Sequence, residues 1–130
     1  MDNVATAVEA VLITLDMLGS IQTLKDIAKR FRKVLLAHAQ YKLGVMYKNG
    51  RGVQQDNAKA VEWYRKAAEQ GHANAQYKLG VMYKNGSGVQ QDNAMVVEWY
   101  SKAAEQGHAN AQNELRFLMG PPEQFVDIKA

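Results

Sequence analysis

The fold is decided by a stretch of sequence that occurs twice in succession. Residues 37–72 read AHAQYKLGVMYKNGRGVQQDNAKAVEWYRKAAEQGH, and residues 73–108 read ANAQYKLGVMYKNGSGVQQDNAMVVEWYSKAAEQGH. A third, partial copy begins at residues 109–112 and then diverges. A 36-residue period with helical patterning is typical of a solenoid, in which each unit packs on its neighbours. The two full copies differ only at His38/Asn74, Arg51/Ser87, Lys59/Met95, Ala60/Val96 and Arg65/Ser101.

Each unit is predicted to form two antiparallel helices joined by a loop. Apolar residues recur at helical spacing in the first helix, and Gly50 can end that helix in a left-handed conformation. Asp56 is well placed to cap the second helix. Gly44 costs about 1 kcal/mol of helix propensity but leaves room for a close neighbour. The expected apolar stripe of the second helix comprises Ala60, Tyr64, Ala67 and Ala68.

The motif A-x-x-x-L-G-x-x-Y-x-x-G-x-G-V-x-x-D, followed by A-x-x-W-Y-x-x-A-A-x-x-G, resembles the Sel-one-like repeat (SLR) family, whose repeats are related to the tetratricopeptide repeat. The resemblance covers residues 37–119, the last of them only in part. It implies an all-α fold, a right-handed α-solenoid of antiparallel helix pairs with helical caps, and a concave face that binds a protein or peptide. Secreted bacterial members often carry paired cysteines in each repeat, and the absence of cysteine here argues against that branch.

By analogy with tetratricopeptide units, residues offset from the core stripe of each first helix face the concave groove. Tyr41, Val45 and Lys48 share one helix face because they follow i, i+4, i+7 spacing. Tyrosine, amide and lysine side chains suit an extended peptide with an acidic terminus. The alternative is that the tyrosines only pack between repeats. The candidate peptide-binding residues are His38, Tyr41, Val45, Lys48, Asn49, Asn74, Tyr77, Val81, Lys84 and Asn85.

Composition and motifs predict a protein without catalysis, metal or cofactor. The chain has no cysteine, which excludes disulfides and thiolate chemistry, and its net charge of +3 is too small to predict nucleic-acid binding. Glu69 and His72, repeated at Glu105 and His108, have the spacing of paired metal ligands, but a glycine ends the helix between them. The Gly-x-Gly loops follow helices rather than strands, so they predict turns and not phosphate sites. A metal protein or an enzyme is a remote alternative.

Residues 1–36 do not continue the repeat and are predicted to form a helical hairpin that caps the solenoid. Gly19-Ser20 supplies a helix stop followed by an N-cap. No glycine or proline separates the hairpin from the first repeat, so we expect one continuous helix over residues 21–49. A basic run in this helix predicts either a contact with an acidic partner or phosphate backbone, or a solvated face; it comprises Lys25, Lys29, Arg30, Arg32 and Lys33.

Residues 109–130 are predicted to be a partial repeat followed by a C-terminal cap, giving six or seven helices in all. Pro121 has the position of the first turn of a last short helix, from which Phe125 and Ile128 could pack back. The alternative is a frayed tail. If the caps leave apolar residues open, chains could stack end to end, so we expect either a monomer or end-to-end self-association.

The sequence favours a cytoplasmic protein with no membrane segment. The apolar residues 1–19 lack an initial basic region, and Glu9 and Asp16 interrupt them. No run reaches the roughly 20 uninterrupted apolar residues of a membrane span.

Two functions are compatible with these patterns. Near-identical repeats joined to an unrelated hairpin predict an engineered or fused repeat scaffold for protein or peptide interaction, without an evolved ligand. The alternative is a natural bacterial SLR adaptor that binds a protein partner through its concave face, because a recent duplication also produces near-identity.

Overall fold

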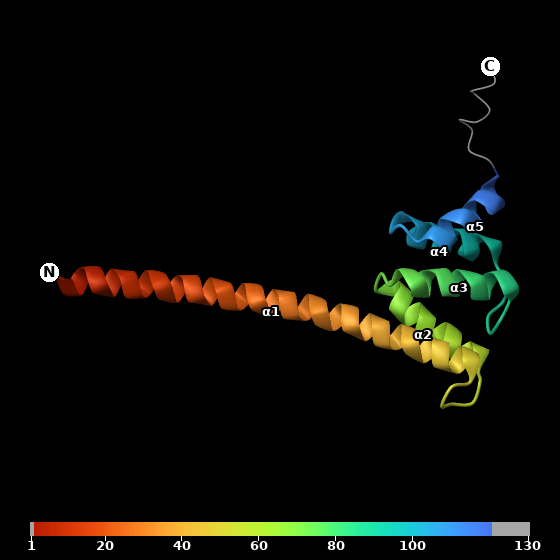
Figure 1. Cartoon of the computed structure of the whole chain (residues 1–130), viewed down its shortest axis with the longest axis horizontal. Coiled ribbons are helices and arrows are strands. Elements are labelled where there is room, and N and C mark those ends of the chain that lie inside the picture. Colours follow the sequence, from red (N-terminus) through yellow and green to blue (C-terminus); the bar gives the residue numbers. More distant parts are fainter. Residues whose placement is uncertain (1, 121–130) are drawn as a thin grey trace, which may run out of the picture. The chain divides into compact units, whose positions relative to one another are not determined.

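The computed structural model describes residues 2–120, which are all-α (Figure 1). Within this range there are five helices, namely α1 (Asp2–Asn49), α2 (Asn57–Glu69), α3 (Ala73–Asn85), α4 (Asn93–Glu105) and α5 (Ala109–Met119). The chain divides into two units, an N-terminal unit, Met1–Lys33, and a repeat unit, Val34–Ala130. The expected last short helix, with Pro121, Phe125 and Ile128, lies outside the described residues.

The repeat unit is a solenoid of consecutive antiparallel helices. The end of α1, from residue 37, pairs with α2 as the first repeat, and α3 pairs with α4 as the second. Within the described residues, the partial copy supplies α5, which packs on α4. Figure 1 shows α2, α3, α4 and α5 following one another in chain order. This is the architecture that the 36-residue period predicts.

Short-range signals fix the ends of these helices. The Asp56 carboxylate caps α2 by accepting the Lys59 backbone N–H at 3.1 Å, and Asp92 caps α4 in the same way. Gly50 follows α1 with a φ of 70° and Gly86 follows α3 with a φ of 65°. This left-handed conformation favours glycine, because a side chain there meets the following carbonyl. The predicted cap at Asp56 and the predicted stop at Gly50 are therefore confirmed.

The core of the repeat unit is built from second-helix aromatic residues and alanines. Ala60, Tyr64, Ala67 and Ala68 are all buried, as predicted for the apolar stripe of α2. The second repeat buries Val96, Tyr100 and Ala103 of its own copy of this stripe, leaves Ala104 partly buried, and adds Trp99, which is only 6% exposed. The Trp99 indole N–H has no hydrogen-bond partner among the described residues. Packing of small and aromatic side chains, without disulfides, holds the repeats together.

Two glycines allow this packing. A Cβ atom built on Gly80 would lie 2.5 Å from ring carbons of Tyr100, and one on Gly44 would overlap the ring of Tyr64 in the same way. Each tyrosine ring therefore lies directly on the backbone of the preceding helix. Gly44 is needed for this close approach, as the sequence predicted.

The N-terminal unit differs from the expected hairpin. α1 is a single helix over Asp2–Asn49, so no turn forms at Gly19-Ser20, and residues 21–49 lie within this one helix. Gly19 keeps a negative φ, unlike the glycines that end the other helices. The prediction of a turn was wrong because glycine inside a helix costs only about 1 kcal/mol, which does not by itself break the helix. Thr23 Oγ1 also donates to the Gly19 carbonyl oxygen at 3.0 Å, a bond made within the helix.

The N-terminal part of α1 is apolar and exposed. It contains an 18-residue window apolar enough to cross a membrane, with no more than two charged residues. Signal sequences and buried core helices meet the same criterion, so this property does not assign a location. It does remove the argument that no stretch of the chain is apolar enough to span a membrane. The exposed large apolar residues of the N-terminal unit are Val4, Val8, Val11, Leu12, Ile13, Leu15, Met17, Leu18, Ile21, Leu24, Ile27 and Phe31.

Candidate functional site

A pocket of about 350 Å³ is lined mainly by residues of α1 and α3, the first helices of the two repeats. We call it the first-junction pocket. Helix α2 contributes its floor through the buried ring of Tyr64. The other lining residues come from one edge of each first helix, so the 36-residue repeat itself positions them. The lining residues are Tyr41, Val45, Lys48, Asn49, Tyr64, Lys78, Val81 and Met82.

The structure brings half of the ten predicted groove residues into this pocket. Those five are Tyr41, Val45, Lys48, Asn49 and Val81. Their role in binding stays a prediction. The other five do not line it, since four of them make contacts elsewhere and Asn85 lies exposed at the end of α3. The four with other contacts are His38, Asn74, Tyr77 and Lys84.

Sequence reasoning missed Tyr64, Lys78 and Met82. The prediction took one face of each first helix, whereas the pocket uses one edge of α1 and the facing edge of α3. Lys78, Val81 and Met82 lie at i, i+3 and i+4 on α3, and this spacing identifies the facing edge. Tyr64 was assigned to the core, and it is indeed buried while its ring also forms the pocket floor.

The two groove tyrosines also stack on the histidine that ends their own repeat. The Tyr41 ring stacks on the His72 ring, with centroids 4.7 Å apart, and Tyr77 stacks on His108 at the same distance. Tyr77 lies 5.4 Å from Tyr100, also stacked. Tyr41 therefore combines packing with pocket lining, while the ring contacts of Tyr77 are packing contacts within the second repeat.

The charges in the first-junction pocket are all positive. Lys48 and Lys78 both line it, no acidic residue does, and neither lysine forms an ion pair with any described residue. Burial raises the pKa of Tyr41, and burial together with Tyr41 raises the pKa of Tyr64 to about 12. Both phenols therefore stay neutral near pH 7, so the lysines alone set the charge of the pocket.

The second junction, between α3 and α5, has the same framework but a different charge. Lys84 stands there in the place of Lys48, and Glu114 stands in the place of Lys78. The Lys84 Nζ atom lies 3.1 Å from Glu114 Oε2, so this pair is closed on itself. A single change of residue type at one repeat position thus separates a positively charged junction from a neutralised one.

The histidines at the repeat boundaries are helix caps. His72 Nδ1 accepts the Ala75 backbone N–H at 3.1 Å, and His108 Nδ1 accepts that of Ala111 at 3.2 Å. Because Nδ1 is an acceptor, the neutral ring carries its proton on Nε2. The Nε2–H of His72 then donates to His38 at 3.3 Å, and that of His108 donates to Asn74 at 2.9 Å.

His38 and Asn74 therefore share one role although they differ in type, because each accepts a hydrogen bond from a cap histidine. The His72 ring nitrogens are both engaged, one in the cap and one with His38, and the Glu69 carboxylate makes no contact with that ring. Glu69 is the last residue of α2, and His72 is the N-cap of α3 after the turn at residues 70–71.

Lowering the pH from 7.5 to 5.5 is expected to destabilise the repeat unit. Burial, and then the charge of His38, lowers the pKa of His72 below its usual 6.5, and burial and Lys78 lower that of His108. The unfolded chain therefore binds protons at a higher pH than the folded chain does. The stabilisation that the two neutral histidines give the folded state is complete above about pH 6.5, and it is lost as the pH falls through their lowered pKa values.

The loss should be of the order of one N-cap, roughly 1 kcal/mol for each histidine. Urea unfolding at both pH values, followed by tryptophan fluorescence, measures it, since Trp63 and Trp99 both lie in the repeat unit. The double variant His72→Asn/His108→Asn is the control, because asparagine caps a helix without titrating. If that variant loses as much stability as the natural chain, the caps are not the cause.

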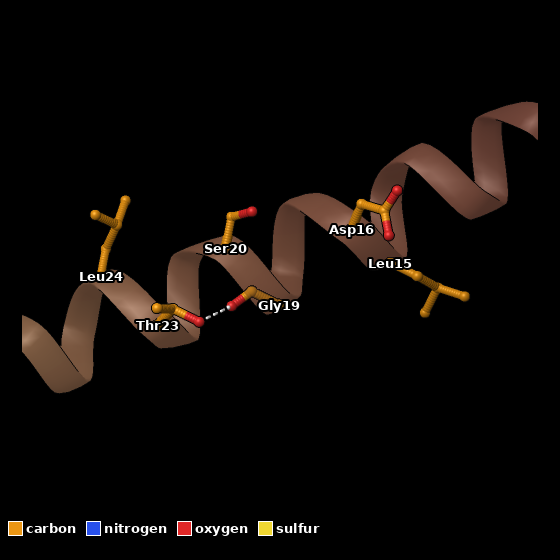
Figure 2. A pocket seen from close by; sticks show the side chains of 6 residues that line it. All are labelled: Leu15, Asp16, Gly19, Ser20, Thr23 and Leu24. Carbon is orange, nitrogen blue, oxygen red and sulfur yellow. Dashed lines mark hydrogen bonds between the residues drawn. The ribbon is translucent and has the colours of Figure 1, made fainter.

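The described residues of the N-terminal unit form a hollow of a different kind. Figure 2 shows a hollow around Gly19 whose lining side chains all belong to α1, among them Asp16 and Ser20. One helix alone cannot enclose a ligand, so this hollow is a surface feature. The five basic residues from Lys25 to Lys33 are exposed on the same helix.

Comparisons with known proteins agree with this architecture. The profile of the Sel1 repeat matches residues 37–72 and 73–108, together more than half of the chain. A search of curated proteins gave no match. Among solved structures, the Sel1 repeat protein from Oxalobacter formigenes is similar at 44% identity with a TM-score of 0.62, over 63% of this chain and 34% of that one.

Two further solved structures are similar. A protective antigen present in uropathogenic Escherichia coli strains, with an SLR fold, is 49% identical with a TM-score of 0.63, over 64% of this chain and 18% of its own. Helicobacter pylori cysteine rich protein B is 28% identical with a TM-score of 0.58, over 59% of this chain and 58% of its own. The chain thus spans less than two thirds of each. All three are bacterial proteins rather than designed ones, so they favour natural origin over the expected engineered scaffold.

Proposed function

The chain belongs to the Sel1 repeat family, and from that premise we propose that it is a non-catalytic bacterial adaptor that binds an extended segment of a partner protein. The first-junction pocket is the binding site in this proposal. The observation that carries it is the lining of that pocket, in which aromatic, aliphatic, amide and lysine groups from three helices converge on one cavity. Such a mixture suits peptide recognition, where apolar contacts supply affinity and polar groups fix orientation.

The packing beneath the pocket supports a rigid site. Tyr64 is buried against Gly44, and the Tyr41 ring is held between those of Tyr64 and His72. A pre-formed groove binds with little loss of conformational entropy. The histidines also support a role without catalysis. The unprotonated Nδ1 atoms of His72 and His108 accept backbone N–H groups as helix caps, so they do not serve as bases.

The proposal is tested by filling the pocket. Asn49 is exposed at its rim, so Asn49→Trp should place a large side chain over the cavity without disturbing the core. Peptides selected from a random display library against the natural chain should bind this variant at least tenfold more weakly in fluorescence anisotropy, because the pocket is no longer open. Asn85→Trp is the matched control, since Asn85 is the equivalent residue of the next repeat and lies outside the pocket. Peptides that bind Asn49→Trp as tightly as the natural chain, or a library that yields no peptide, would contradict the proposal.

A further inference from the structure

We infer that the first-junction pocket selects an acidic side chain of its partner, which lies between Lys48 and Lys78. This inference rests on the proposed function and names the chemistry that the pocket recognises. It starts from the two lysines, which line the pocket from different helices and form no ion pair with any described residue. The Lys78 Nζ atom also lies 6.0 Å from the centroid of the Tyr77 ring. An ammonium group binds a carboxylate through a charge-assisted hydrogen bond, about twice as strong as a neutral one.

The second junction shows how the same framework holds a carboxylate. There Lys84, the equivalent of Lys48, binds Glu114, the equivalent of Lys78. The carboxylate also acts on the aromatic floor, since burial, then Glu114, then Tyr77 raise the pKa of Tyr100 to about 12. Tyr100 is the equivalent of Tyr64, so the charge of Glu114 acts on the counterpart of the ring that forms the floor of the first-junction pocket.

The two junctions therefore differ in where the carboxylate comes from. In the second junction the chain supplies it from α5, and the site is closed. In the first junction the same position carries Lys78, so the chain supplies a second ammonium group instead. A carboxylate that enters this pocket meets two lysines and no acidic residue in its lining.

The occupant is a side chain of a protein segment rather than a free ion, for two reasons. Its counterpart in the second junction, Glu114, is itself a glutamate side chain within a helix. The pocket also has an apolar wall, formed by Val45, Val81 and Met82, which an inorganic anion would leave without contacts. A glutamate side chain, with its methylene groups, covers that wall while its carboxylate reaches the lysines.

The experiment titrates the ¹⁵N-labelled full chain with the blocked peptide acetyl-Ala-Glu-Glu-Ala-amide. The amide signals of Lys48, Lys78 and Val81 should shift. The neutral peptide acetyl-Ala-Gln-Gln-Ala-amide should shift them at least tenfold less at the same concentration. Two further arms use acetyl-Ala-Gln-Gln-Ala with a free carboxyl terminus and inorganic phosphate. Equal or larger shifts in either arm would overturn the assignment to an acidic side chain.

Two charge reversals locate the effect. Lys78→Glu copies Glu114 and should pair with Lys48, so the acidic peptide should bind at least tenfold more weakly. Lys42→Glu is the matched control, because Lys42 is the equivalent residue of the first repeat, is exposed, and does not line the pocket. It makes the same change in net charge and should alter the affinity less than twofold. Equal weakening by both variants would mean that only net charge matters, and would overturn the inference.

A gain of binding gives the sharpest test. Glu114→Lys removes the partner of Lys84 and gives the second junction the lysine pair of the first. We expect the acidic peptide to shift the amide of Lys84 in this variant and not in the natural chain. The absence of any new shift would contradict the inference. If library peptides bind in a pocket-dependent manner but lack acidic residues, this inference fails while the proposed function stands.

Discussion

Replacing Gly80 with alanine is expected to lower the free energy of unfolding of the repeat unit by roughly 2 kcal/mol, within the range of about 1–3 kcal/mol typical of overpacked cores. The added Cβ atom would lie 2.5 Å from ring carbons of Tyr100, and that ring is only 1% exposed, so it has no free space into which to move. Alanine gains about 1 kcal/mol of helix propensity over glycine, which reduces the loss but does not reverse it. Urea unfolding followed by tryptophan fluorescence measures the effect.

Gly19→Ala is the matched control for this substitution. Gly19 is also inside a helix, but a Cβ atom there meets nothing within 4 Å. Only the propensity term remains, so this variant should increase helicity by circular dichroism and leave the tryptophan transition unchanged. If Gly80→Ala proved as stable as the natural chain, the tyrosine rings would not need the glycine backbone beneath them.

The second large effect is expected at Leu79, where substitution by alanine should cost about 2–5 kcal/mol. Leu79 is 0% exposed and lies in the centre of the core of the repeat unit. The loss combines the transfer free energy of the removed atoms with that of the cavity left behind, because the surrounding helices relax only in part.

The repeat supplies its own graded controls for Leu79→Ala. Leu43 and Leu115 occupy the same position in the first and partial copies, and both are only partly buried. Their alanine variants should lose less stability than Leu79→Ala does in the same urea titration. Equal losses at all three positions would show that burial within the array does not set the cost.

The fold of the repeat unit could be predicted from the sequence because its signals are local and occur twice. The cap at Asp56, the stop at Gly50 and the small residue at Gly44 each act within one or two turns, and each was found where expected. The family resemblance is shown by the profile match and by the similar solved structures.

The N-terminal unit could not be predicted in the same way. Gly19-Ser20 has the composition of a turn, but whether a helix continues through glycine depends on tertiary contacts that one sequence does not specify. The exposed apolar side chains of this unit have no counterparts at equivalent positions of the 36-residue repeats. The cytoplasmic location, the absence of membrane contact and the oligomeric state therefore stay predictions.

The pocket was predicted in part, for a geometric reason. Helical spacing identifies residues that share a face of one helix, which is how Tyr41, Val45 and Lys48 were found. It does not show which edge of the next helix faces them, so Lys78 was missed. Comparison of equivalent repeat positions would have drawn attention to Lys78, because the partial copy carries Glu114 there.

Arg116 determines how an array of this kind can lengthen. It occupies the position of Gly44 and Gly80, so a tyrosine-bearing helix could not pack on α5 as Tyr64 and Tyr100 pack on the preceding helices. Duplication of the gene segment that encodes one 36-residue unit can therefore add units of this kind on the N-terminal side of α5 but not packed onto α5 itself. Each unit inserted after residue 108 would place a new lysine opposite Lys84, while Glu114 would stay opposite the equivalent lysine of the unit that precedes α5. If each lysine pair binds an acidic side chain as we propose, recombination within the gene would change the number of such contacts in whole steps, one for each added copy.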